Sequence, residues 1–374
     1  MDYRICSSCV MDTTDKFITF DNKGVCNHCL LYAERKKKLI QNSHEKHQAL
    51  TNTIHTIKKS SKNKKYDCIV GISGGVDSSY VAYLAKQWGL RALLVHLDNG
   101  WNSELAVKNV ENIVKYTGFD LYTLVINWEE FKDLQRSFFK ADVIDLELLS
   151  DHAIFATVNK LTRTYKINYL LSGENFETEA ILPVSWNWRK SDAKNIKAIH
   201  KKYGSLKLRT FPFMSSLKKT IMQYTGVAKS IPILNFLDYN KENVMEILKN
   251  EMNWKYYGGK HYESLFTRFY QGVVLPKKFG IDKRRAHLST LINSKQLLRD
   301  EALALLKEEI YPKALQQEDF ELVCKKLDFT PQELDNYLSR PGKSHLNYGS
   351  DEKLFNLMRK IYHFFGLKRF NNYT

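Results

Sequence analysis

Residues 73–79 have the composition of a loop that binds phosphate. They are Ser73, Gly74, Gly75, Val76, Asp77, Ser78 and Ser79. Adjacent glycines let the backbone approach an anion closely, and a helix that begins directly after them presents unpaired N–H groups. The serine hydroxyls add donors, and the carboxylate of Asp77 can hold Mg²⁺. No Lys-Ser or Lys-Thr pair follows the glycines, so this is not a Walker loop, and an ordinary glycine-rich turn is the alternative.

Four of the six cysteines form two close pairs, Cys6-x-x-Cys9 and Cys26-x-x-Cys29. This spacing is typical of a tetrahedral zinc site made of four thiolates. Such a site has no open position, so the zinc would be structural, and so small a segment needs it to fold. A redox pair and an iron–sulfur cluster are the alternatives. We expect His28 to lie on the surface or next to the metal without binding it.

Strands and helices alternate around the loop. We predict strands at residues 67–72, 91–97, 121–126 and 168–172, and helices at 78–88 and 103–116. This alternation predicts an α/β fold with a parallel sheet and ligands at the carboxyl ends of its strands. The residues at those ends are Gly71, Ile72, His96, Leu97, Asp98, Asn99, Gly173 and Glu174. Asp98 either accepts from a ribose hydroxyl or caps the following helix, and Glu174 is a candidate metal ligand or general base.

The chain divides into four predicted segments. Residues 1–32 form the zinc-binding ribbon, 33–65 a basic helical connector, 66–240 the α/β nucleotide domain and 241–374 a mostly helical region for substrate or partner. We expect helices at 294–307 and 330–338 in the last segment.

The chain carries a formal net charge of +16, much of it from lysines and arginines between residues 35 and 65. Such a run is more typical of a solvated helix face than of a nucleic-acid patch. The sequence holds neither a secretion signal at its start nor an apolar run that spans a bilayer, which predicts a cytoplasmic protein.

The loop at residues 73–78 resembles the pyrophosphatase loop (PP-loop) of the N-type ATP pyrophosphatases, a superfamily that includes GMP synthetase, NAD synthetase and tRNA-thiolating enzymes. Further blocks are similar to those of the N-acetyl sugar amidotransferases of the WbpG and PseA type. These blocks are residues 6–14, 24–29, 173–175, 181–188, 257–264, 266–269, 283–289 and 299–302. They cover nearly the whole chain and are not general features of PP-loop enzymes.

The resemblance implies a set of site residues on an adenine nucleotide alpha hydrolase-like domain. ATP would bind at Gly71, Ile72, Ser73, Gly74, Gly75, Asp77, Ser78, Ser79, His96, Leu97, Asp98, Asn99 and Gly173. The candidate catalytic residues are Asp77, Glu174, Lys260 and His261. The candidates for binding an acidic sugar are Trp186, Trp188, Glu263, Arg268, Lys283, Arg284, Arg285 and His287. The alternatives for this last group are surface ion pairs, a subunit contact and core packing.

The resemblance also implies the reaction. An acetamido group of a bacterial surface-polysaccharide sugar or nonulosonic acid, of the pseudaminic or legionaminic kind, would become an acetamidino group. Its amide oxygen would attack the α-phosphorus of Mg²⁺-bound ATP and release pyrophosphate, after which ammonia would displace AMP. Cys68 and Cys324 are expected to be core residues, so the chain offers no nucleophilic cysteine for glutamine hydrolysis. Ammonia would therefore come from a partner glutaminase, with a cyclase-like conduit subunit as a further possible partner.

Two other functions remain open from the sequence. A tRNA-thiolating or tRNA-modifying PP-loop ATPase would share the N-terminal cysteines and the basic surface, although the further central cysteines of tRNA thiolases are missing. A zinc-ribbon nucleic-acid binder or an inactive scaffold would not need the intact loop.

Overall fold

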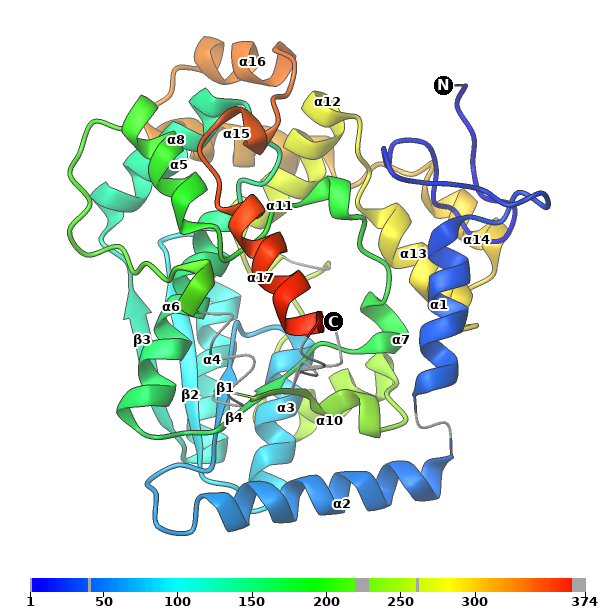
Figure 1. The fold of residues 1–374 in the computed structure, drawn as a ribbon, viewed down its shortest axis with the longest axis vertical. Coiled ribbons are helices and arrows are strands. Elements are labelled where there is room, and N and C mark those ends of the chain that lie inside the picture. The colour runs from blue at the N-terminus through cyan, green and yellow to red at the C-terminus, as the bar shows by residue number, and fades with distance from the viewer. Residues whose placement is uncertain (1, 40–41, 219–228, 260–261, 365–374) are drawn as a thin grey trace.

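The computed structural model describes residues 2–39, 42–218, 229–259 and 262–364 (Figure 1). A five-stranded parallel sheet in the order β3-β2-β1-β4-β5 lies at its centre. The strands are β1 (Cys68–Gly71), β2 (Ala92–Asp98), β3 (Asp120–Val125), β4 (Tyr169–Ser172) and β5 (Lys229–Pro232). The predicted parallel α/β fold is confirmed. Strand order reverses between β1 and β4, and such a switch point opens a crevice for ligands.

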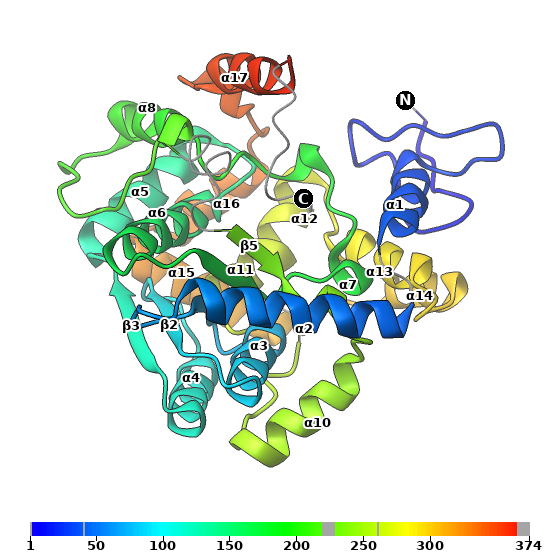
Figure 2. The same ribbon diagram turned by 60° about the horizontal axis from the view of Figure 1, so that its bottom comes forward.

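The two faces of the sheet are covered by different helices. Cys68 and Val70 pack with one group of helices, whereas Ile69 between them packs against the other face, as the two-residue period of a strand requires. The first group is α2 (Ser43–Ser60), α3 (Val76–Gln87), α4 (Glu104–Thr117) and α10 (Lys241–Met252), which lie together in Figure 2. The other face is covered by α6 (Leu148–Thr164).

The helices next to the loop follow local sequence signals. The side chain of Ser103 accepts a hydrogen bond from the N–H of Ala106 and caps α4, and Gly118, with φ of +68°, ends it. The alternative in which Asp98 caps this helix is therefore wrong. Helix α3 begins at Val76, two residues before the predicted start, because the loop residues form its first turn.

The C-terminal half is mostly helical, as predicted. Its elements are α11 (Leu265–Phe269), η3 (Tyr270–Val274), α12 (Leu275–Phe279), α13 (Arg284–Asn293), α14 (Arg299–Leu305), α15 (Lys313–Leu327), α16 (Pro331–Ser339), η4 (His345–Asn347) and α17 (Glu352–Phe364). Helices α11, η3, α12, α13, α15 and α16 share a core with α5 (Trp128–Ala141). The single helix predicted at 294–307 is wrong, because Lys295 has a φ of +64° and separates α13 from α14.

Shorter elements complete the chain. They are α1 (Asn27–Lys38), α7 (Phe176–Glu179), η1 (Val184–Trp186), α8 (Ala193–Tyr203) and η2 (Ile233–Phe236). Helix α1 and the cysteine segment (residues 2–29) lie beside α13 and α14 in both views (Figures 1 and 2). Within the described ranges, none of the helices combines the length and apolarity needed to cross a bilayer.

Candidate active site

The loop between β1 and α3 depends on a glycine that no other residue can replace. Gly74 has a φ of +82°, and a Cβ on it would lie 2.5 Å from the carbonyl oxygen of Ala106. Trp254 Nε1 donates to the carbonyl oxygen of Gly74 at 2.9 Å, and Asn109 Nδ2 donates to it at 3.3 Å. These contacts fix the loop from outside, so its shape does not depend on a bound anion.

Serine hydroxyls hold the inside of the loop. Ser78 and Ser79 donate to the carbonyl oxygen of Gly75 at 3.2 and 2.5 Å, and Gly75 is the N-cap of α3. Ser73 and Ser78 also line a pocket, whereas Ser79 is fully buried. Ser79 was predicted to contact the nucleotide, but in the structure its hydroxyl shapes the loop.

Asp77 lies on the first turn of α3, against the end of β4. The hydroxyl of Tyr239 donates a hydrogen bond to its carboxylate. A Cβ on Gly173 would lie 3.1 Å from the carbonyl carbon of Asp77 and 3.2 Å from the backbone nitrogen of Ser78. The small size of Gly173 therefore makes room for α3, in place of the predicted room for a nucleotide.

A pocket of about 320 Å³ opens beside the loop at the carboxyl ends of the strands. Its wall consists of Gly71, Ile72, Ser73, Ser78, Val95, His96, Leu97, Asn99, Asn102, Leu124, Glu147, Ser150, Asp151, Ile154, Thr157, Glu263, Ser264, Phe266 and Thr267. A Cβ on Gly71 would meet no atom within 4 Å, so this glycine leaves the pocket floor open. The sheet, α6 and the start of α11 each supply one side of the wall.

His96 connects the ends of β1 and β2. Its Nδ1 lies 2.9 Å from the carbonyl oxygen of Ile72, and its Nε2 lies 3.2 Å from the side-chain nitrogen of Asn102. The carbonyl can only accept, so Nδ1 donates and Nε2 accepts. His96 thus presents a fixed, buried ring to the pocket. Asp98 accepts from the N–H of Gly100 at 3.0 Å and lies outside the pocket wall, so its ribose contact stays a prediction.

One end of the pocket is acidic. Glu147 and Asp151 line it at the start of α6, and Lys190 pairs with Asp151 at 3.0 Å and with the buried Asp145 at 2.7 Å. Burial raises the pKa of Asp151, and the charges of Glu147 and Asp145 add to this effect, although Lys190 opposes it. Burial also favours a higher pKa for Asp145, but the charge of Lys190 and its hydrogen bond outweigh burial, so the pKa of Asp145 is lowered. These acidic residues were not among the predicted site residues, because they belong to no recognisable motif.

Glu263 is the predicted sugar-binding residue that the structure places in the pocket wall. Arg268, one helical turn further, instead forms a bidentate ion pair with buried Asp319, at 2.6 and 2.8 Å. Its guanidinium is used to join α11 to α15, which corrects the predicted contact with a sugar. Lys283 reaches the acidic end, 3.9 Å from Glu147.

The rest of the predicted basic cluster does not reach the pocket. Arg285 pairs with Asp12 at 2.9 Å and donates to the carbonyl oxygen of Val10. Arg284 binds Asp282 and backbone carbonyls after α14. His287 Nδ1 donates to the carbonyl oxygen of Thr178 at 3.1 Å. The contacts of Arg285 and His287 dock the cysteine segment and α7, and those of Arg284 hold the end of α14, so the predicted role in binding a sugar acid is corrected for all three.

The two tryptophans are also structural. Trp186 is 3% exposed within the main core. Trp188 stacks on the ring of His345 at 4.9 Å and donates through Nε1 to Asp192. Both rings already pack against protein, which corrects the prediction that they stack on a sugar or base.

Three further predicted catalytic residues have roles that stay predictions. Lys260 and His261 lie outside the described residues. Glu174 is exposed at the end of β4 and is absent from the pocket wall as described, so its proposed role stays a prediction.

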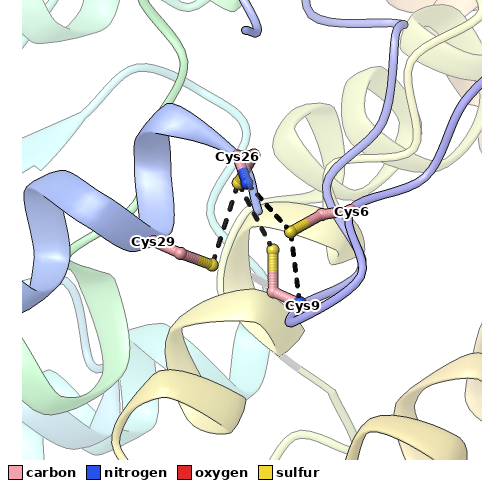
Figure 3. Close-up of side chains that lie close together, drawn as sticks. All are labelled: Cys6, Cys9, Cys26 and Cys29. Atoms are coloured by element: carbon pink, nitrogen blue, oxygen red, sulfur yellow. Dashed lines mark hydrogen bonds between the residues drawn. The ribbon is translucent and has the colours of Figure 1, made fainter. Parts of the chain in front are cut away.

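The four paired cysteines converge at a second site (Figure 3). The sulfur atoms of Cys6, Cys9, Cys26 and Cys29 all lie within 4.8 Å of one another, and all four residues are buried. Four buried thiolates at this separation repel one another unless a cation lies between them, and the set fits a closed tetrahedral metal. His28 bonds Asp15 through Nε2 at 2.7 Å and is not among the described metal-ligating residues.

Cys68 and Cys324 are both buried, as predicted. Burial raises the pKa of the Cys324 thiol, as it does that of Cys68, so neither thiol is activated as a nucleophile.

Two family models match separate parts of the chain. That of NAD synthase matches residues 47–205, and that of the C-terminal domain of WbpG-like LPS biosynthesis proteins matches residues 263–362. The fold, the loop and the first match define a PP-loop domain like that of NAD synthase, and PP-loop proteins as a class use ATP. The second match shows that residues 263–362 are similar to the C-terminal domain of the WbpG-like proteins.

Three individual proteins are also similar. The tRNA(Ile)-lysidine synthase of Chlamydia pneumoniae is 38% identical over 77 residues, which are 20% of this chain and 24% of that protein. The chain thus matches about a quarter of that relative's length. NMN synthetase from Francisella tularensis is 12% identical with a TM-score of 0.34, covering 78% of this chain and 98% of that one. NH3-dependent NAD synthetase from Campylobacter jejuni is 16% identical with a TM-score of 0.30, covering 55% and 93%.

Proposed function

We propose that this protein is an AMP-forming amidotransferase that converts the acetamido group of an acidic bacterial sugar into an acetamidino group. The observation that carries the proposal is the composition of the pocket wall. Residues from Gly71 to Thr157 come from the segment similar to NAD synthase, and Glu263, Ser264, Phe266 and Thr267 from the WbpG-like segment. The pocket therefore joins a nucleotide-binding surface to the part of the chain that is specific to WbpG-like proteins.

The pocket suits the two halves of the reaction. Ser73, Ser78 and the N–H groups at the start of α3 hold the triphosphate, and Val95 and Leu124 offer apolar contact to adenine. An amide is a poor electrophile, so its oxygen attacks the α-phosphorus and pyrophosphate leaves. Ammonia then adds to the imidate carbon, and AMP leaves with that oxygen. The carboxylates of Glu147 and Asp151 accept hydrogen bonds from sugar hydroxyls.

Two metals fit the chain's residues. Asp77 would hold Mg²⁺, which neutralises charge on the phosphates when bound. Cys6, Cys9, Cys26 and Cys29 would hold zinc, whose closed thiolate shell has no catalytic position. The cysteine segment bonds α14 through Arg299, which donates to the carbonyl oxygens of Cys6 and Cys9 at 2.9 and 3.1 Å. Zinc would therefore stabilise the packing of the cysteine segment against α14.

A partner glutaminase supplies ammonia in this proposal. Since both cysteines outside the quartet are buried core residues, the chain has no thiol nucleophile of its own for glutamine. We expect ammonium salts alone to support turnover, whereas glutamine alone does not. Turnover with glutamine and the purified chain would contradict the need for a partner.

The test is a panel of N-acetylated sugar acids, free and nucleotide-linked, incubated with the protein, ATP, Mg²⁺ and ammonium. The expected product is one mass unit lighter than its substrate, because oxygen is replaced by NH, and AMP forms in equal amount. ATP hydrolysis without any change in sugar mass across the panel would contradict the proposed substrate class.

A tRNA-modifying ATPase is the second candidate, favoured by the short match to tRNA(Ile)-lysidine synthase and by the net charge of +16. Nucleic acid that co-purifies through high salt, or AMP formation that requires tRNA, would support it. AMP formation with a sugar in nuclease-treated protein would exclude it.

A further inference from the structure

A segment after α10 crosses the phosphate loop and is tied to it. Asn109 Nδ2 donates to the carbonyl oxygen of Lys255 at 2.8 Å, and Asn109 Oδ1 accepts from the N–H of Lys255 at 2.9 Å. The same Asn109 nitrogen contacts the carbonyl oxygen of Gly74, to which Trp254 also donates. Residues 254–257, called here the strap, therefore share their anchors with the loop and cannot shift independently of it.

The strap places one side chain at the start of α3. The hydroxyl of Tyr257 lies beside the backbone N–H of Val76, the first residue of α3. It lies 3.3 Å from the position that a Cβ on Gly75 would occupy, and Glu263 Oε1 lies 3.8 Å from the same position. The hydroxyl thus lies against the loop next to Gly75, close to Ser73 and Glu263, which both line the pocket.

The chemistry of this hydroxyl suits an anionic ligand. Burial raises the pKa of Tyr257, and the negative charges of Glu263 and Asp77 raise it further. The hydroxyl therefore keeps its proton and can donate to a phosphate oxygen. An anion bound at the start of α3 could therefore accept from both the N–H of Val76 and the hydroxyl of Tyr257.

We propose that Tyr257 is a ligand of the pyrophosphate that leaves ATP, and thus a catalytic residue outside the loop itself. This inference rests on the proposed function for the identity of the leaving group. The residue lies before the WbpG-like segment and after the segment similar to NAD synthase, so neither match covers it. It also explains why the strap is anchored to the loop: a donor to a leaving group must be held in position before reaction.

The test compares Tyr257→Phe with Tyr256→Phe in the full-length protein. Tyr256 is the matched control, because it is adjacent in the strap but 51% exposed. Binding of inorganic pyrophosphate with Mg²⁺ is measured by calorimetry, and AMP formation is measured with the sugar substrate. We expect Tyr257→Phe to weaken pyrophosphate binding and lower kcat about ten- to hundredfold, the usual effect of losing a hydrogen bond to a charged group. Tyr256→Phe should change neither.

Other outcomes separate this inference from the proposed function. Unchanged or tighter pyrophosphate binding in Tyr257→Phe would overturn the inference. Unchanged binding would mean that the hydroxyl does not contact the anion, and tighter binding would mean that it competes with the anion for the start of α3. The unmodified protein failing to bind pyrophosphate would overturn it too. Conversely, weakened pyrophosphate binding in a protein that amidinates no sugar would leave Tyr257 as a ligand and contradict only the substrate.

Discussion

At the scale of single residues, the sequence located the loop but not all that surrounds it. The loop Ser73–Gly74–Gly75 could be predicted because a backbone conformation such as that of Gly74, with φ of +82°, favours glycine, and the glycine is visible in the sequence. Arg268 could not be assigned, because its partner Asp319 is distant in sequence and the pairing depends on how α11 meets α15. Likewise, Tyr257 begins a block that resembles the N-acetyl sugar amidotransferases (residues 257–264), but that resemblance gave it no role.

Asp77→Asn tests the loop at this scale. The change keeps the size of the side chain and its neighbour Tyr239 but removes the charge that would hold Mg²⁺. We expect AMP formation to fall about hundredfold or more, because charge stabilisation in the transition state is lost. Asp120→Asn is the control, since Asp120 is an exposed residue at the opposite end of the sheet, paired with Lys65. Full activity in Asp77→Asn would contradict the role of this carboxylate.

At the scale of elements, strands with continuous apolar runs were predictable and short polar ones were not. Four strands were found from the sequence, whereas β5 (Lys229–Pro232) has only one aliphatic residue, Ile231, and forms because β4 pairs with it. Helix α14 was merged with the preceding turn, since nothing in the sequence marks the left-handed conformation of Lys295. Tertiary pairing decided both outcomes.

Variants of the ion pair between Arg268 on α11 and Asp319 on α15 distinguish a structural role of Arg268 from a role in substrate binding. Arg268→Met leaves buried Asp319 without its guanidinium, so we expect unfolding to become easier by about 3 kcal/mol or more. The double variant Arg268→Met with Asp319→Leu should regain most of that stability and keep a KM for the sugar near that of the unmodified protein. A stable double variant with a greatly raised KM would show that Arg268 contacts the sugar after all.

At the scale of the whole molecule, the cysteine segment, the helical region and the sheet depend on one another. The sequence predicted that the four cysteines converge, but not that Arg285 and Arg299 bind the segment to α13 and α14. Arg285 was predicted to bind substrate and Arg299 was given no role, because a basic residue carries no local sign of the carboxylate or carbonyl it will meet.

Removal of metal tests this dependence. We expect one zinc per chain, and we expect a strong chelator or Cys26→Ser to lower Tm, since zinc binding contributes directly to folding free energy. Val10 and Met11 of the segment are fully buried against the rest of the protein, so the loss should also expose apolar surface. Cys68→Ser, outside the quartet, should leave the zinc content unchanged. An unaltered Tm in verified metal-free protein would contradict this account.

Acid sensitivity should arise at His345. Burial lowers its pKa to about 4, an effect to which Lys190 adds and which Asp145 opposes. In the unfolded chain, where its pKa is about 6.5, His345 binds a proton before it does so in the folded protein. As pH falls from about 6.5 toward 4, proton binding therefore favours the unfolded state and lowers the free energy of unfolding, whereas above pH 6.5 His345 has no such effect. We expect a loss of about 2 kcal/mol between pH 7 and pH 5. Chemical denaturation with zinc in excess measures it, and His345→Gln should flatten the dependence; an equally steep dependence in that variant would assign it to other groups.

The most direct test of the central claim is where ATP is cut. The reaction contains ATP, Mg²⁺, ammonium and an N-acetylated sugar that the protein amidinates. Phosphorus NMR identifies its products without coupling enzymes. A loop that grips the two terminal phosphates predicts AMP and pyrophosphate in equal amounts. The appearance of ADP and inorganic phosphate in their place would contradict the account.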